Sequence, residues 1–106
     1  MTAIAGTPAM AHAFLEIAAP RAGDNLKTPP AKVEMHFTES LEGAFSGIAV
    51  TDEGGHDVTA APSSTMGTEM EVALKPLPPG RYRVTWHAVS IDTHRTDGKY
   101  NFLVLP

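Results

Sequence analysis

Hydrophobic and polar residues alternate along several short segments of the chain, with the two-residue period that indicates β-strands buried on one face. In residues 32–37, three apolar side chains alternate with two charged side chains and a histidine. In residues 81–89, Trp86 and three other apolar residues share one face. We predict seven short strands, at residues 13–18, 32–37, 47–52, 57–60, 68–75, 81–89 and 99–105.

Glycine and proline, nine of each, separate these segments, as is typical of all-β domains. Residues 20–30 and 62–67 are predicted to be loops, and residues 53–56 a turn. The proline-rich run at residues 76–80 cannot lie in a central strand, because proline lacks the amide donor. No segment indicates a helix. We therefore predict an all-β fold, a Greek-key β-sandwich or barrel of about seven strands, immunoglobulin-like or cupredoxin-like.

Composition excludes several classes of protein. The 106 residues form one domain, and the absence of cysteine excludes disulfides and thiolate metal sites. The net charge is -4 and the eight lysines and arginines are scattered along the chain, so no basic stripe is available for nucleic acid or for an anionic membrane surface. No apolar run reaches the roughly 20 residues that membrane insertion as a helix requires.

The segment after residues 81–89 places Asp92 and His94 two positions apart. In an extended backbone, residues i and i+2 point to the same face, so these two side chains can converge as two metal ligands would. Residues 90–98 interrupt two strongly patterned strands without simply turning the chain. From these residues alone, a structural hydrogen bond between the aspartate and the histidine is an equal alternative. Three other histidines are assigned to the surface or to structural hydrogen bonds: His36, His56 and His87.

The N-terminal residues contain Ala9-Met10-Ala11, a small-x-small pattern that signal peptidase cleaves. Cleavage there would leave His12 as the first residue. A basic region and a long apolar stretch, which a complete signal peptide has, are missing. We interpret residues 1–11 as a leader remnant or an extension, and residues 12–106 as the single functional domain.

Residues 77–94 carry the pattern G-x-Y-x-V-x-W-x-A-V-S-x-D-T-H, followed by a glycine and a final strand. This pattern resembles the C-terminal signature of CopC-type periplasmic copper-binding proteins. Residues 29–39 are similar to the family's P-x-K-I-x-L-x-F-S-E strand, and residues 45–47 to its F-S-G. The resemblance covers about residues 12–106.

Members of this family bind Cu(II) through the amine and imidazole of an N-terminal histidine and through the aspartate and histidine of the D-T-H tract. The resemblance therefore implies one Cu(II) per chain, held by His12, Asp92 and His94, with Glu39 beside the site. The ligand set agrees with coordination chemistry, because Cu(II) prefers tetragonal sites built from nitrogen and oxygen donors.

The same resemblance implies a function. The protein would buffer or carry copper in the periplasm, for copper homeostasis or resistance, without catalysing a reaction. It would hand the ion to a CopD-like transporter of the inner membrane or to a target protein.

Two departures from the family pattern matter. Many members carry a methionine-rich loop that binds Cu(I), whereas residues 47–70 offer only Met66 and Met70, with His56 nearby. Met70 also belongs to the apolar face of its strand, so core packing is its expected role. A Cu(II)-only member is therefore predicted. In addition, Arg95 follows the D-T-H tract where the family often has proline.

Two alternatives come from other classes of protein. A histidine that chelates copper by its amine and side chain also occurs in copper monooxygenases and related oxidases, which present the ion on a broad substrate-binding face. Aromatic side chains on such a face would favour that interpretation, but the tryptophan and both tyrosines occupy inward strand positions. The third interpretation is a metal-free, immunoglobulin-like interaction module.

Overall fold

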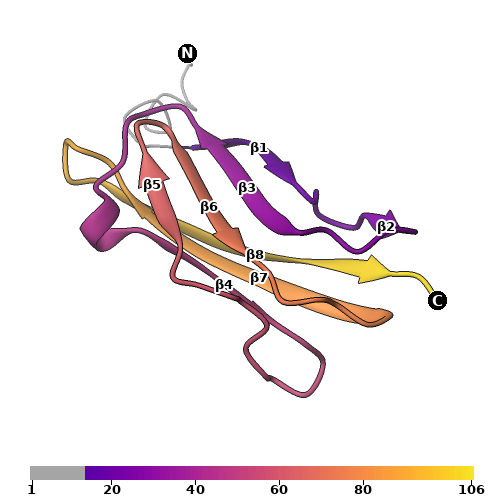
Figure 1. The fold of residues 1–106 in the computed structure, drawn as a ribbon. Helices are drawn as coiled ribbons and strands as arrows, with labels where there is room; N and C mark the ends of the chain where they lie inside the picture. Colours follow the sequence, from indigo (N-terminus) through magenta and orange to yellow (C-terminus); the bar gives the residue numbers. More distant parts are fainter. Residues whose placement is uncertain (1–13) are drawn as a thin grey trace, which may run out of the picture.

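The computed structural model describes residues 14–106, which form two four-stranded sheets packed face to face (Figure 1). The first sheet has the order β1-β3-β6-β5 and the second β2-β8-β7-β4. The first sheet contains β1 (Leu15–Ala19), β3 (Lys32–Phe37), β5 (Ser64–Met66) and β6 (Glu69–Ala73). The second contains β2 (Asn25–Leu26), β4 (Gly47–Thr51), β7 (Gly80–Val89) and β8 (Arg95–Val104). A 3-10 helix, η2 (Gly43–Phe45), lies between β3 and β4.

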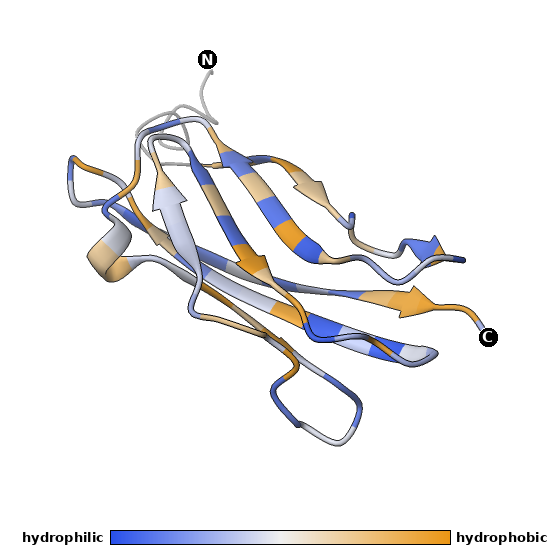
Figure 2. Cartoon of the chain, in the orientation of Figure 1, coloured by the Kyte–Doolittle hydropathy of each residue, from blue (hydrophilic) through white to orange (hydrophobic). Residues whose placement is uncertain are grey.

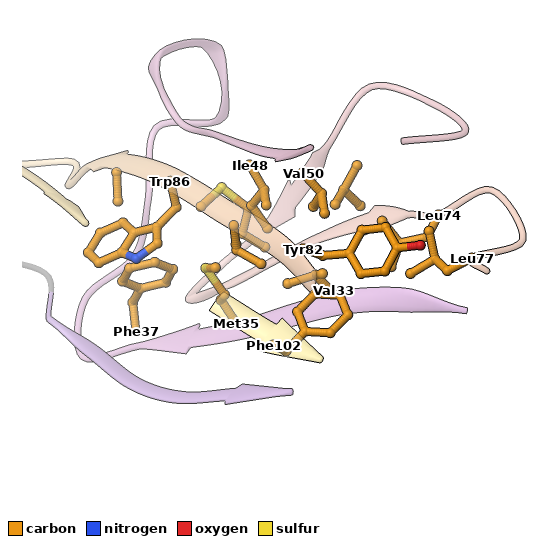
Figure 3. Close-up of a cluster of buried hydrophobic side chains, with 14 of the residues drawn as sticks. Val33, Met35, Phe37, Ile48, Val50, Leu74, Leu77, Tyr82, Trp86 and Phe102 are labelled. Carbon is orange, nitrogen blue, oxygen red and sulfur yellow. The ribbon is translucent and has the colours of Figure 1, made fainter. Parts of the chain in front are cut away.

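Alternation along the strands builds the core between the two sheets. Figure 2 shows apolar and polar residues alternating along β3 and β6, and every second residue of β3 is buried. Trp86 of β7 packs edge-on against Phe37 of β3, with ring centroids 5.4 Å apart (Figure 3). Farther along the core, Tyr82 and Phe102 stack at the same centroid distance. The predicted inward faces are thus confirmed, and Met70 is a core residue, as expected.

The all-β prediction is confirmed, and the two sheets form a sandwich rather than a closed barrel. Two loop predictions were wrong in part, because residues 20–30 contain β2 and residues 62–67 contain β5. Residues 57–60 form no strand, only the bridges Thr51↔Asp57 and Thr59↔Leu74. Among the described residues, no helix is long and apolar enough to cross a membrane.

The final strand begins at Arg95, four residues before the predicted start at Lys99. It pairs with β7 from Val89↔Arg95 to Gly80↔Val104. The prediction that residues 90–98 do more than turn the chain was therefore wrong. Ser90 to His94 make the hairpin turn, and the rest of that segment is strand.

Gly98 lies opposite Trp86 in this pairing and lets the indole ring cover the backbone of β8. A β-carbon at Gly98 would stand 2.9 Å from Cζ2 of Trp86, closer than van der Waals contact. The ring cannot move away freely, because it is packed against Phe37.

We expect Gly98→Ala to lower the free energy of unfolding by about 1–3 kcal/mol, the usual cost of overpacking a core. Urea unfolding followed by circular dichroism measures this change, with the same probe in variants that lack the single tryptophan. Adding Trp86→Phe should make the cost of Gly98→Ala smaller, because a phenyl ring leaves room for the methyl group. Equal unfolding midpoints for Gly98→Ala and the wild type would contradict this account of the packing.

Candidate metal centre

The turn between β7 and β8 is held by the backbone of Ser90. Its carbonyl oxygen accepts a hydrogen bond from the amide of Thr93 at 2.8 Å, and its amide donates to the carbonyl oxygen of His94 at 2.9 Å. Thr93 has φ of 74°, in the left-handed region that β-branched residues rarely adopt. A three-residue hairpin loop that ends in a left-handed residue is a common way to join two antiparallel strands.

Asp92 and His94 come together on this turn. Oδ1 of Asp92 lies 3.3 Å from Nδ1 of His94, and the two side chains are 48% and 46% exposed. The predicted convergence is therefore observed, but its cause differs from the one expected. The backbone between the two residues is not extended, and the left-handed Thr93 brings them together. Both side chains are accessible to an ion from solvent.

Ser90 supports this pair and was missed by the sequence analysis. It is the one buried polar residue among residues 14–106, and its hydroxyl donates a hydrogen bond to Oδ1 of Asp92. That bond, together with His94, holds the pKa of Asp92 below its ordinary value. The two-residue spacing did not mark this role, because Ser90 to His94 form a turn rather than an extended strand.

The described chain starts at the same end of the sandwich. Phe14 and Thr38 are joined by hydrogen bonds from the Phe14 amide to Thr38 Oγ1 and from the Thr38 amide to the Phe14 carbonyl, each 2.9 Å long. Two residues farther, the Ser40 carbonyl accepts a bond of 3.1 Å from the amide of Ile91. Figure 1 shows the start of β1, the end of β3 and the β7–β8 turn at this end.

Of the other two predicted site residues, the structure describes Glu39 but not His12. Glu39 is half-buried. Its neighbours in the chain are Thr38, which is hydrogen-bonded to Phe14, and Ser40, which is hydrogen-bonded to Ile91. His12 lies outside the described residues. Within residues 14–106, no group of three or more histidine, aspartate or glutamate side chains is placed to hold a metal ion.

The remaining histidines lie elsewhere. His56 is exposed, with Nδ1 3.1 Å from Oδ1 of Asp52 in the turn after β4. Nε2 of His36 lies 3.9 Å from Oε1 of Glu69 on the outer face of the first sheet. The ring of His87 lies against Gly47.

Residues 15–105 match the CopC domain family. Copper resistance protein C of Escherichia coli is 36% identical over 106 residues, which cover 91% of this chain and 83% of that protein. Copper transport protein CutJ of Bacillus subtilis is 35% identical over 98 residues, which cover 89% of this chain and 18% of that protein.

Two solved structures are similar to this chain in both fold and sequence. CopC from Methylosinus trichosporium OB3b has a TM-score of 0.82 at 32% identity, covering 90% of this chain and 95% of that one. PcoC, a methionine-rich copper resistance protein from Escherichia coli, has a TM-score of 0.74 at 36% identity, covering 88% and 98%. The chain therefore belongs to the CopC domain family.

Proposed function

We propose that this protein binds one Cu(II) ion at the β7–β8 turn, through Asp92 and His94 together with the amine and imidazole of His12. The observation that carries the proposal is the convergence of two exposed side chains, with Oδ1 of Asp92 3.3 Å from Nδ1 of His94. The buried hydroxyl of Ser90 holds Asp92 in place by a hydrogen bond. A carboxylate and an imidazole held in this way are two preorganised donors.

In this proposal, His12 supplies the remaining donor atoms, its amine and imidazole nitrogens. His12 precedes Phe14 by two residues, and two residues span at most about 7 Å. Phe14 is bonded to Thr38, and Ser40 is bonded to Ile91, the residue before Asp92. Covalent connection to Phe14 therefore supports a role for the amine and the imidazole of His12 in a site at the β7–β8 turn.

The donor set fits Cu(II) in type and number. The amine and one imidazole nitrogen of His12 form a chelate, the imidazole of His94 adds a third nitrogen, and Asp92 adds a negative charge. Imidazole and amine nitrogens suit Cu(II) better than they suit calcium or magnesium. Glu39 would orient a ligand or a water molecule beside the ion, as carboxylates near metal sites commonly do.

We infer that the ion is cargo and that residues 12–106 form a periplasmic carrier or buffer without enzymatic activity. The relatives described above are named for copper resistance and copper transport, and these are not names of enzymes. In the relative named a copper transport protein, the matched segment is 18% of a longer chain. Transfer of the ion to a CopD-like membrane transporter is part of this proposal, and its support is that this relative is named for copper transport.

The burial of the tryptophan and tyrosine side chains gives little support to the copper-oxidase alternative. Trp86 and Tyr82 are buried in the core, and Tyr100 is half-buried with its hydroxyl bonded to the carbonyl of Pro20. The exposed aromatic rings are phenyl groups, Phe14 and Phe45. Peroxide-dependent cleavage of a polysaccharide by the copper-loaded protein would favour the oxidase, and absence of stoichiometric Cu(II) binding would favour the metal-free module.

The first prediction concerns the chain's start. A chain that begins at Met1 should bind Cu(II) more weakly than one that begins at His12, because its His12 nitrogen is an amide that holds its proton. The loss of Cu(II) affinity should exceed roughly 10–100-fold, which is the cost of removing a side chain that only supports a metal ligand. Competition titration with a chromophoric chelator measures both affinities. Equal affinities would show that the amine is not a ligand.

The second prediction concerns the turn. His94→Gln and Asp92→Asn should each weaken Cu(II) binding, and the histidine change should cost more because it removes a nitrogen donor. His56→Gln is the matched control, since His56 also sits beside an aspartate, at 3.1 Å, in another exposed turn. Calorimetric titration reports the affinities. If His94→Gln bound Cu(II) as tightly as His56→Gln, the assignment would be wrong.

The third prediction concerns Ser90. Because the pKa of Asp92 is lowered in the folded chain, its ionised form stabilises the fold above the unfolded pKa, and this contribution is lost as pH falls through the folded pKa. Ser90→Ala should raise the pKa of Asp92 toward its ordinary value and weaken Cu(II) binding roughly 10–100-fold. Carboxyl-carbon NMR during a pH titration reports the pKa.

The matched control for Ser90→Ala is Thr59→Ala, because the Thr59 hydroxyl donates to Oδ1 of Asp57 at 2.7 Å. That change should raise the pKa of Asp57 and leave both Asp92 and Cu(II) binding unaltered. An Asp92 pKa that does not respond to Ser90→Ala would refute the proposed role of the serine.

A further inference from the structure

Large apolar side chains are exposed at five positions among residues 14–106, and four of these lie at the end of the sandwich that carries the β7–β8 turn. The four are Phe14, Phe45, Met66 and Ile91, and the fifth, Ile17, lies within β1. Figure 1 shows η2, the start of β1, the end of β5 and the β7–β8 turn at this end. We call the four side chains together the end surface.

The connection from β3 to β4, residues 38–46, holds these positions at one end of the molecule. Hydrogen bonds join the first part of this connection to Phe14 and to the backbone of Ile91. Farther along, the amide of Leu41 donates to the carbonyl oxygen of the residue that follows Met66, at 2.9 Å. The fourth side chain of the end surface belongs to the connection itself, within η2.

The surroundings of the end surface are acidic. Residues 38–46, 64–68 and 89–94 contain Glu39, Glu42 and Asp92 but no lysine or arginine. Glu42 is exposed, and the side chain of Asp92 is 48% exposed. A partner that covers this surface therefore needs positive charge around an apolar centre. An anionic membrane surface is a poor match, because its headgroups would face these carboxylates.

We propose that the end surface is the docking site of the protein that receives the copper ion, and that this partner presents an apolar patch with a basic rim. An acceptor has to bring its own donor atoms to an ion held by Asp92 and His94, so it must cover the side chains around the turn. Exposed apolar patches with polar rims mark protein–protein contacts. The inference rests on the proposed function, because the surface serves transfer only if the ion is held at the turn.

Docking is tested by biolayer interferometry of the full chain, with a CopD-like transporter in nanodiscs as the probe. Phe45→Ser and Ile91→Ser should each weaken docking at least about tenfold, the effect of truncating a side chain that contributes strongly to an interface. Ile17→Ser is the matched control, because Ile17 is 63% exposed, against 61% for Ile91, and lies within β1. Either variant docking as tightly as Ile17→Ser, or no docking of the wild type, would overturn the proposal.

Further arms separate the other occupants. Equal binding of the wild type to empty nanodiscs would assign the end surface to lipid. Self-association of the wild type that Ile91→Ser abolishes, measured by analytical ultracentrifugation, would assign the surface to a second copy of the chain. Either result would overturn the proposal.

Copper titrations of the same variants separate this inference from the proposed function. Phe45→Ser should bind Cu(II) as tightly as the wild type, and His94→Gln should dock like the wild type because its end surface is intact. Docking without Cu(II) binding by the wild type would refute the proposed function. Cu(II) binding without docking would refute this inference alone.

Discussion

The pairing of β7 with β8 is the constraint on which the rest of the structure depends. The two ten-residue strands pair along their whole length, from Gly80↔Val104 to Val89↔Arg95. A slip of one residue would turn every side chain to the opposite face, so this register keeps Trp86 in the core. It also leaves only Ser90 to His94 to join the strands. The same register therefore orders the core and brings Asp92 beside His94.

Much of the fold could be predicted from the sequence, because a strand with one buried face carries its own alternating pattern. Residues 32–37 form β3 with the predicted bounds. The strands that were missed, β2 and β5, are two and three residues long and too short for a pattern. They exist because partners are already in place, β8 beside β2 and β6 beside β5.

The candidate site was predictable in part. The proximity of Asp92 and His94 followed from their spacing, although the left-handed Thr93 rather than an extended backbone produces it. The buried position of Ser90 depends on where the turn falls, which the sequence pattern did not locate.

The copper assignment is tested most directly by the electron paramagnetic resonance spectrum of the chain beginning at His12, loaded with one equivalent of Cu(II). We expect a type-2 spectrum with couplings to three nitrogen donors, two from His12 and one from His94. The His94→Gln variant should retain couplings to two. A spectrum that does not change in that variant, or no bound Cu(II) at one equivalent, would contradict the account.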